Sequence, residues 1–527
     1  MQNSAISKYL VVTAFVSGTI VMVIELIGSR VIGPPFGVSL FVWTSLITVT
    51  LVSLAVGYWL GGRLSDANAS HTALFVIILA AGLCLAIVPL IKSAVIDFSL
   101  SFGLRAGSLA SSTVLFAPPL LLLGMVTPYV VKLYITDTSF GIGKTVGWLY
   151  SVSTAGSFVG TVLTGFVLIP NIGVNKIIYL SSLVLVASAV VYFAWFKRRL
   201  VAIILVLAPV VPSFYTPGLP AFNRPDGTSV ELVEKEDTAY GQIKVVDYSY
   251  GREHLREFLS DSIIQGGIDV NTGLSIASYT YYIERLSRAY NKTAKNALVV
   301  GLGAGLIPSN LQKYYGIKTD VVEISPSVVK TAEKYFAFDG SKVKVHVQDG
   351  RYFLKTSSDI YDIIVLDAFS GDITPGHLMS VEAFSLIKKR LATGGVLLIN
   401  FIGGNMPDDK FVLTSLYGTL SPVFKNIDVY SQDNYFAKEP SVVNIVFVAH
   451  DAAVLDEAAL MPGWSAQPVH TPLRADIDGI YKRKVAVEKG PIIFTDDYNP
   501  ADFFDMRLRE RFRALTLNSA DKAVIVN

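Results

Sequence analysis

Long apolar runs dominate the first two hundred residues of the chain. A transmembrane helix needs about 20 predominantly apolar residues, and six runs reach that length. They lie near residues 9–29, 38–60, 73–91, 110–134, 146–169 and 176–196. A seventh run, near 200–216, is shorter and contains Pro209 and Pro212. The pattern predicts an α-helical transmembrane bundle of six to eight helices.

The pattern changes after a linker at 217–225 that contains Pro and Gly. Polar and apolar residues alternate from 229 to 265, as they do in the strands of a small antiparallel sheet. Beyond this stretch, apolar strands alternate with helices, which predicts an α/β doubly wound, Rossmann-like sheet. The strands lie near 297–300, 320–323, 344–347, 362–366 and 396–399, and helices lie near 326–336 and 380–391. The predicted domains are a membrane helical domain (1–217), a small β-sheet subdomain (218–270) and the Rossmann-like domain (271–527).

The composition agrees with a membrane protein. Hydrophobic residues make up 52% of the chain, charged residues make up 16%, and the mean hydropathy is +0.50. Residues 1–200 hold eleven basic and four acidic residues, and subtracting these from the totals of 44 and 42 leaves 33 basic and 38 acidic residues in 201–527. The acidic second part argues against a nucleic-acid partner and suits a cationic ligand. The single cysteine, Cys84, excludes an intrachain disulfide.

The basic residues indicate an orientation in the lipid bilayer. With six alternating spans, Lys8, Arg63, Lys132, Lys144 and Lys197 fall on one side, which the positive-inside rule assigns to the cytoplasm. We expect a multi-pass protein of the cell (inner) membrane with a cytoplasmic Rossmann-like domain. This requires either that 200–216 is re-entrant or interfacial, or that a further crossing lies around 93–109.

A glycine-rich turn follows the strand at 297–300. Gly301, Gly303 and Gly305 allow a tight turn and let backbone N–H groups approach a ligand at the start of the next helix. Glu323 ends the next strand about 20 residues on, the spacing at which an acid accepts hydrogen bonds from ribose hydroxyls. The spacing Gly-x-Gly-x-Gly suits an adenosyl ligand without a pyrophosphate. The alternative is an ordinary glycine-rich turn.

Two aspartates follow further strands of the same predicted sheet. Asp349 and Gly350 come after the third strand, and Asp367 ends the fourth. The carboxyl ends of parallel strands meet at one edge of a sheet, so we expect both acids to lie near Glu323. The alternative is that they only cap the turns that follow them.

These motifs resemble the spermidine synthase (polyamine aminopropyltransferase) family, in the form fused to an N-terminal membrane domain. The resemblance spans about 229–450. It implies that Glu323 holds a ribose, that Asp349 binds adenine, and that Asp367 and Tyr279 are catalytic, as the base and as part of the amine channel. It also implies that S-adenosylmethionine or its decarboxylated form is a substrate and that 5′-methylthioadenosine is released. The residues that would bind the sulfonium are Gln242, Gly301, Gly303, Ala304, Gly305, Glu323, Asp349 and Gly350.

The amine side of the family's site is largely changed in this chain. Ala304 stands where the family's glycine loop has an Asp, and Ser370 stands where its Asp-x-x-Asp motif has a second acid. Thr280 replaces a Gln of the amine channel, and Gln242 is one place away from another ligand-binding Gln. Asp372, two places beyond the expected acid, is the remaining candidate for holding an acceptor with Ser370.

Three hypotheses follow from this pattern. An aminopropyltransferase would transfer the aminopropyl group of decarboxylated S-adenosylmethionine to putrescine or a similar amine. Because Ala304 removes an acid that would repel a carboxylate, the enzyme could instead cyclise the aminocarboxypropyl group of intact S-adenosylmethionine. The third hypothesis is a transporter or sensor regulated by an adenosyl ligand, and it rests on Glu25 within a predicted span, for which Arg30 or Arg63 is an alternative partner. We expect a homodimer and, because the six histidines lack ligand spacing, no metal.

Overall fold

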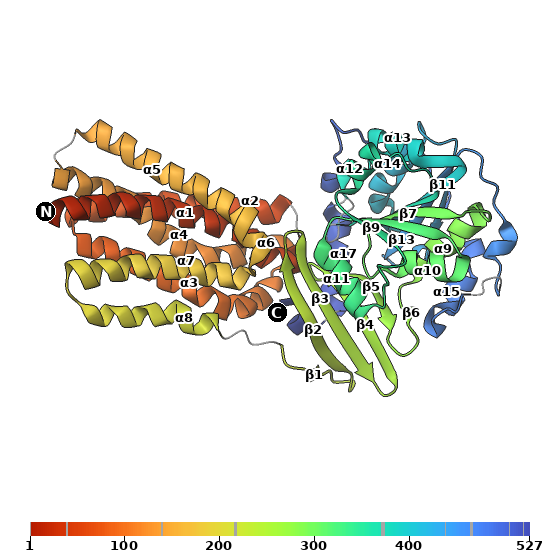
Figure 1. Ribbon diagram of the computed structural model, residues 1–527, viewed down its shortest axis with the longest axis horizontal. Coiled ribbons are helices and arrows are strands. Elements are labelled where there is room, and N and C mark those ends of the chain that lie inside the picture. Colours follow the sequence, from red (N-terminus) through yellow and green to blue (C-terminus); the bar gives the residue numbers. More distant parts are fainter. Residues whose placement is uncertain are drawn as a thin grey trace. The chain divides into compact units, whose positions relative to one another are not determined.

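The structure is a computed structural model that describes most of the chain (Figure 1). The described residues are 2–37, 40–138, 141–214, 219–369, 375–437, 439–463, 467–504, 506–519 and 521–526. They divide into two compact units. The helical unit comprises Met1–Leu219, Glu236–Gln242 and Asp521–Asn527, and the α/β unit comprises Pro220–Lys235 and Ile243–Ala520.

The helical unit contains six helices that are long and apolar enough to cross a membrane, counted among the described residues. They are α1 (Gln2–Phe36), α2 (Leu40–Ala67), α3 (His71–Leu100), α4 (Gly103–Thr138), α5 (Ile142–Leu163) and α7 (Val174–Val191). Short segments extend or follow them, namely η1 (Thr164–Leu168), α6 (Ile169–Asn171), η2 (Tyr192–Phe196), η3 (Leu200–Val206), α8 (Leu207–Ser213) and α18 (Lys522–Val526). The count of six is at the lower bound of the range expected from the sequence.

The sequence leaves open a further crossing around 93–109 and the form of the seventh apolar run, and the helix bounds bear on both. Because α3 continues to Leu100 and α4 begins at Gly103, the region around 93–109 holds the turn between these two helices and no additional helix. The seventh apolar run forms η3 and α8, which pack against α7, with α8 also against α3. This segment has 14 residues, fewer than the roughly 20 that a full transmembrane helix needs.

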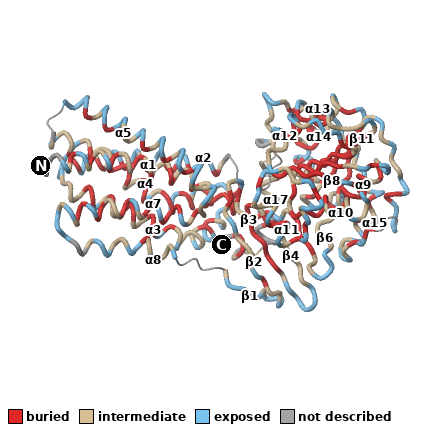
Figure 2. Tube along the Cα trace, in the orientation of Figure 1, coloured by how far each residue is buried: buried red, intermediate tan, exposed pale blue. Residues whose placement is uncertain are grey.

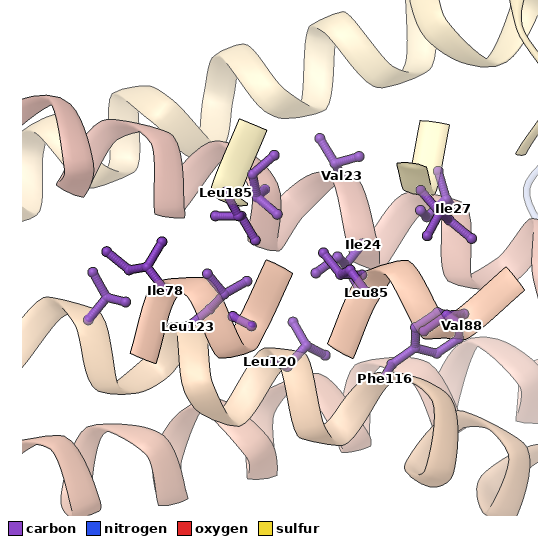
Figure 3. Close-up of a cluster of buried hydrophobic side chains, with 14 of the residues drawn as sticks. Val23, Ile24, Ile27, Ile78, Leu85, Val88, Phe116, Leu120, Leu123 and Leu185 are labelled. Carbon is purple, nitrogen blue, oxygen red and sulfur yellow. The ribbon is translucent and has the colours of Figure 1, made fainter. Parts of the chain in front are cut away.

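Apolar side chains and close backbone contacts hold the bundle together. Figure 3 shows the centre of this core, where Ile24 and Ile27 of α1 lie among side chains of α3, α4 and α7. Gly57 of α2 faces α4, and a β-carbon there would lie 2.3 Å from the Leu121 carbonyl oxygen. Gly156 of α5 faces α1 in the same way, since its β-carbon would lie 2.1 Å from the Phe15 carbonyl oxygen. Gly57 with Gly61, and Gly156 with Gly160, are small-residue motifs four positions apart, a spacing that predicts close helix contacts. At both Gly57 and Gly156 the contact is so close that a side chain does not fit.

The first sheet of the structure has six strands in chain order. They are β1 (Phe222–Asn223), β2 (Ser229–Thr238), β3 (Gly241–Tyr250), β4 (Glu253–Ser260), β5 (Ile263–Asp269) and β6 (Leu274–Ser275). The β3–β4 and β4–β5 pairs are antiparallel, with Tyr248 opposite Leu255. Val245 and Phe258 on one face pack against Leu306, the first residue of the helix that follows the glycine turn. This face therefore fixes β4 and β5 beside that turn.

The second sheet has seven strands in the order β12-β13-β11-β10-β7-β8-β9. They are β7 (Asn296–Val300), β8 (Lys318–Glu323), β9 (Lys344–Val347), β10 (Tyr361–Leu366), β11 (Leu391–Gly404), β12 (Asn426–Ser431) and β13 (Val442–His450). The run β11-β10-β7-β8-β9 is parallel, and β13 and β12 continue it antiparallel. The α/β sheet predicted from the sequence is confirmed.

Helices cover this second sheet on both faces. The α-helices are α9 (Ser278–Tyr290), α10 (Leu306–Tyr315), α11 (Pro326–Tyr335), α12 (Gly350–Thr356), α13 (Val381–Arg390), α14 (Lys410–Leu420), α15 (Arg474–Asp478), α16 (Ala501–Phe504) and α17 (Met506–Ser519). The 3-10 turns are η4 (Gly376–Leu378), η5 (Pro407–Asp409), η6 (Asp433–Phe436), η7 (Glu457–Leu460), η8 (Thr471–Leu473) and η9 (Ile480–Lys482). Alternate strand residues such as Leu298 and Val299 enter two separate cores, which leaves the central strands buried (Figure 2).

Candidate active site

The turn between β7 and α10 is built from glycines in the left-handed backbone region. Gly301, Gly303 and Gly305 have φ values of 96°, 54° and 75°. A β-carbon on Gly301 would lie 2.1 Å from the carbonyl oxygen of Asp367, closer than non-bonded atoms can approach. Both observations require glycine at 301. They also show that the turn after β7 lies directly against the end of β10.

Glu323, at the end of β8, is tied to this turn by its carboxylate. Oε2 accepts a hydrogen bond from the Leu302 N–H at 3.0 Å, and Oε1 accepts one from the Ser325 N–H at 2.8 Å. The residue is 8% exposed. Burial raises the pKa of the carboxyl, and the backbone donors oppose that rise. Glu323 therefore orders the glycine turn in this structure, and its role as a ribose ligand stays a prediction.

Asp367 directly follows β10 and is held by a neighbouring strand. The side-chain amide of Asn400, on β11, donates to Asp367 Oδ1 at 2.7 Å. Burial raises the pKa of the Asp367 carboxyl to about 7, although the Asn400 hydrogen bond lowers it. Among the described residues, Oδ2 has no hydrogen-bond partner. This carboxyl can therefore exchange a proton near neutral pH and has one oxygen available to accept it.

A chain of amides continues from Asp367 across the sheet. Asn444 of β13 donates from Nδ2 to Asn400 Oδ1 at 2.9 Å, and its backbone N–H donates to Gln432 Oε1 at 3.2 Å. Gln432 Nε2 in turn donates to Ser278 Oγ at the start of α9. This amide chain fixes the rotamer of Asn400, and through it the carboxyl of Asp367.

Tyr279 reaches the same place from α9. Its hydroxyl donates to the Gln265 carbonyl oxygen of β5 at 2.9 Å. Burial, and then the charge of Asp367, raise the pKa of this phenol well above its usual value, so it stays protonated and can donate. The structure thus brings Tyr279 and Asp367 together, as the sequence predicts for the two catalytic positions.

A pocket of about 80 Å³ lies beside Tyr279 and Asn400. Its polar lining comes from Gln265, Tyr279, Asn400 and Asn444. Its apolar lining is Ile264, Phe369, Ile402, Val442, Val443 and Phe512. No Asp, Glu, Lys, Arg or His side chain is among these lining residues, and Asp367 is the carboxyl that is hydrogen-bonded to the lining residue Asn400.

Asp349 caps a helix at the same edge of the sheet. Its Oδ1 accepts from the Tyr352 N–H at 2.8 Å, which closes the first turn of α12, and His377 Nε2 lies 3.2 Å from Oδ2. A β-carbon on Gly350 would lie 2.6 Å from Val300 Cγ1 at the end of β7. The capping alternative therefore describes Asp349 in this structure, whereas no backbone N–H of the described residues donates to the Asp367 carboxylate. Adenine binding by Asp349 stays a prediction.

Among the other predicted site residues, Ala304 and Gln242 do not line the pocket. Ala304 is 4% exposed and lies against Gly266 of β5, where an added β-carbon would be 3.3 Å from Ala304 Cβ. Gln242 belongs to the helical unit, where its amide donates to Asp237 at 2.8 Å. Ser370 and Asp372 lie outside the described residues. Within the described ranges, no three His, Cys, Asp or Glu side chains are grouped so that they could hold a metal ion.

The amide chain is the part of the site that the sequence analysis missed. Asn400 interrupts the apolar run of β11, and Asn444 interrupts that of β13. A polar residue inside a buried strand is a signal in itself, because an unpaired buried amide is costly. The signal does not show which strands will be neighbours, and the contact with Asp367 depends on that.

Residues 277–431 match the family described as the spermine/spermidine synthase domain. A polyamine aminopropyltransferase of Vibrio vulnificus is 40% identical over 143 residues, which cover 26% of this chain and 45% of that protein. A probable polyamine aminopropyl transferase of Bifidobacterium longum is 26% identical over 265 residues, which cover 48% of this chain and 57% of that protein. The chain thus spans about half the length of these curated relatives.

Among solved structures, a probable spermidine synthase from Corynebacterium glutamicum aligns with 54% of this chain and 99% of its own, at 18% identity and a TM-score of 0.40. The family match over residues 277–431 places a spermidine synthase-like domain in the second half of the chain, and a helical region is fused N-terminal to it.

Proposed function

We propose that this protein is a membrane-bound transferase that acts on an S-adenosyl sulfonium and releases 5′-methylthioadenosine. The observation that carries the proposal is Asp367. Its carboxyl, with a pKa raised to about 7, stands behind an uncharged pocket at the strand edge that also holds Glu323 and the glycine turn. The polyamine aminopropyltransferases among the relatives point to the same chemistry.

The proposed reaction transfers an aminopropyl group from decarboxylated S-adenosylmethionine to an amine. The neutral amine nitrogen attacks the carbon next to the sulfonium, so that a C–N bond forms and the C–S bond breaks with its electron pair left on sulfur. The proton leaves the amine for Oδ2 of Asp367. Because an ammonium has a pKa of about 10, a nearby base is needed to take its proton and keep the amine neutral. The Tyr279 hydroxyl holds the backbone of Gln265, and both residues line the pocket.

The donor would lie along the strand edge. Glu323 would accept hydrogen bonds from the ribose, Asp349 and Gly350 would face the adenine, and the backbone of Gly301 to Gly305 would approach the nucleoside. The burial of Glu323 and its two backbone donors support this, since they hold its carboxylate in one orientation.

A second reaction is favoured by one observation. Ala304 is a buried, uncharged neighbour of β5, and no acid lines the described pocket, so nothing described there repels a carboxylate or holds a second ammonium. Intact S-adenosylmethionine could then react with its own amine or carboxylate. The ring closes as the C–S bond breaks, and 5′-methylthioadenosine leaves without an acceptor.

The six apolar helices support a multi-pass protein of the lipid bilayer, and we infer a homodimer as its assembly. We also propose the domain boundaries at 217 and 270 that the sequence predicts.

Mass spectrometry of the products tests the proposal. Purified full-length protein is incubated with each sulfonium, with and without putrescine. Aminopropyl transfer predicts 5′-methylthioadenosine and a longer amine only from the decarboxylated donor with amine present. Cyclisation predicts 5′-methylthioadenosine from intact S-adenosylmethionine alone. No 5′-methylthioadenosine under any of the four conditions would overturn both reactions.

A further inference from the structure

The C-terminal helix α17 supplies one wall of the pocket beside Asn400. Phe512 of this helix lines the pocket together with Ile264 of β5 and Ile402 of β11. The helix also packs against β13, which contributes further lining residues. Phe512 lies beyond residues 277–431, so the match to the spermine/spermidine synthase domain assigns it no role. What this aromatic wall does for a substrate has to follow from the shape of the pocket.

Arg511, one residue before Phe512, ties α17 to the carboxyl end of β11. Its Nη1 donates to Asp409 Oδ2 at 2.5 Å, and the Asp409 side chain is 2% exposed. The same Oδ2 lies so close to the last residue of β11 that a β-carbon on Gly404 would be 2.3 Å from it. A buried carboxylate needs a charged partner, and Arg511 supplies it. This ion pair fixes α17 at the end of the strand that carries Ile402.

Arg513, one residue after Phe512, ties α17 to the turn between β4 and β5. Its side chain is buried, and Nη1 donates to the Asp261 carbonyl oxygen at 3.3 Å. Asp261 and Ser262 are the two-residue loop of this hairpin and have φ values of 46° and 64°, as in a type I′ turn. Both residues are buried, although such turns usually lie at the surface. This contact fixes α17 beside the strand that carries Ile264.

The two contacts determine which way the ring between them points. Successive side chains of an α-helix are turned by about 100° around its axis. Arg511, Phe512 and Arg513 therefore leave α17 in three directions, toward β11, the pocket and the β4–β5 turn. A helix held on two sides cannot rotate about its axis, so the ring of Phe512 stays in the pocket wall.

The pocket that this ring bounds is small. Its volume is about 80 Å³. A dry apolar cavity of about 150 Å³ is enough to hold a benzene ring. The pocket therefore has room for a short aliphatic chain and not for an aromatic group. Removing the Phe512 ring from the wall would add the space that a phenyl group needs.

We propose that Phe512 determines the size of the group that the substrate carries on sulfur, and that it restricts this group to a short, linear alkyl chain. The inference rests on the proposed function, because the alkyl group of the sulfonium must then reach the carboxyl of Asp367. That carboxyl is hydrogen-bonded to the lining residue Asn400. Arg511 and Arg513 are positioning residues, which act by holding the ring in the wall.

Calorimetric titration of the full-length protein with two thioadenosines tests the proposal. 5′-Methylthioadenosine carries a small group on sulfur, and 5′-(benzylthio)adenosine carries an aromatic ring. The wild type should bind the benzyl compound about tenfold more weakly or worse, because an apolar pocket discriminates strongly against an oversized group. This ratio should fall in Phe512→Leu and further in Phe512→Ala, to within about threefold. Leu515→Ala, at an exposed apolar residue of the same helix, should keep the wild-type ratio.

The positioning role has its own variants. Arg511→Ala should lower the same ratio, because the ring is no longer held, although no lining residue has changed. Arg511→Lys keeps a positive charge beside Asp409 and should restore the ratio. A ratio that Arg511→Ala leaves unchanged would overturn the positioning role.

The outcomes for Phe512 and for the proposed function are separate, because the titration needs no turnover. Phe512→Leu keeps an apolar side chain in the wall, so it decides the question if Phe512→Ala does not fold. A ratio that is the same in the wild type and in the folded Phe512 variants, or that changes equally in Leu515→Ala, would overturn the role of Phe512 alone. A wild type that binds neither thioadenosine would overturn the proposed function together with it.

Discussion

Asp367 is balanced between two opposing effects. Burial raises the pKa of its carboxyl to about 7, and the hydrogen bond from Asn400 lowers it. A base acts only in its ionised form, which exists above the pKa. We therefore expect kcat/KM to rise as the pH increases through about 7, on top of the steady rise due to the amine substrate itself.

The variant Asn400→Ala isolates the contribution of Asp367 to that profile. Without the amide donor the ionised carboxylate is less stabilised, so its pKa goes up further and the acidic limb moves to higher pH. The pKa of the free amine does not change in this comparison. Profiles of kcat/KM from pH 5.5 to 9 for both proteins provide the measurement. A limb that stays in place would show that another group titrates.

The residues at strand ends were the predictable part of the site. Asp367, Glu323 and the glycines each follow an apolar run, and parallel strands place such residues at one edge. Asn400 and Asn444 were not predictable in the same way. Their contact with Asp367 arises because β11 lies beside β10 and the antiparallel β13 lies beside β11, an order that no local pattern encodes.

At the scale of elements, the strand–turn–helix unit β7–α10 depends on its first glycine. Gly301→Ala would put a β-carbon 2.1 Å from the Asp367 carbonyl oxygen and would also strain a backbone with φ of 96°. Gly316 provides a control, because it has φ of 67° but no atom within 4 Å of its β-carbon position. Backbone strain costs roughly 1–3 kcal/mol of stability in either variant, and Gly301→Ala adds a steric clash to it.

We expect Gly301→Ala to lower the denaturation temperature of the α/β unit more than Gly316→Ala does, and to weaken the binding of an adenosyl ligand. Thermal denaturation and titration with 5′-methylthioadenosine measure the two effects. Equal shifts for the two variants would mean that the turn relaxes away from β10, and the close contact between these strands would then not be needed.

The small-residue motifs of the bundle show which helix contacts the sequence can predict. Their spacing predicted close helix contacts, and both Gly57 and Gly156 lie at such contacts. The identity of the partner helices, α4 for α2 and α1 for α5, depends on how the whole bundle packs. The antiparallel sheet of 229–265 was predictable from its alternating pattern, whereas the packing of that sheet beside the glycine turn was not, because that contact joins segments far apart in the sequence.

For the whole molecule, the grouping of residues differs from the domains predicted from the sequence. The hairpin segment Glu236–Gln242 and the terminal segment Asp521–Asn527 group with the helices of residues 1–219. Asp237 illustrates the reason, since its carboxylate accepts from the Val174 N–H at the start of α7 at 3.1 Å. Composition predicts each domain as one continuous stretch of the chain. These two segments belong with the helices although they come later in the sequence.

The charge distribution of the bundle predicts an orientation. Six alternating helices place Lys8 and the Lys197–Arg199 cluster at the same end, which the positive-inside rule assigns to the cytoplasm. A green fluorescent protein fused after Arg199 should therefore fluoresce, and alkaline phosphatase fused there should be inactive. The reverse result would contradict six crossings with this orientation. The segment 200–213 then determines on which side the chain continues.

In the proposed mechanism, Asp367 takes the proton and Glu323 holds the nucleoside. Release of 5′-methylthioadenosine and affinity for the sulfonium, measured side by side for Asp367→Asn and Glu323→Gln, test it most directly. Asp367→Asn keeps the size and one acceptor oxygen but cannot accept the proton, so turnover should fall by about 10²–10⁴-fold with affinity within a few-fold. Glu323→Gln should instead weaken binding by roughly 1.5–3 kcal/mol. If Asp367→Asn keeps its rate and loses affinity, Asp367 is a structural residue and the mechanism is wrong.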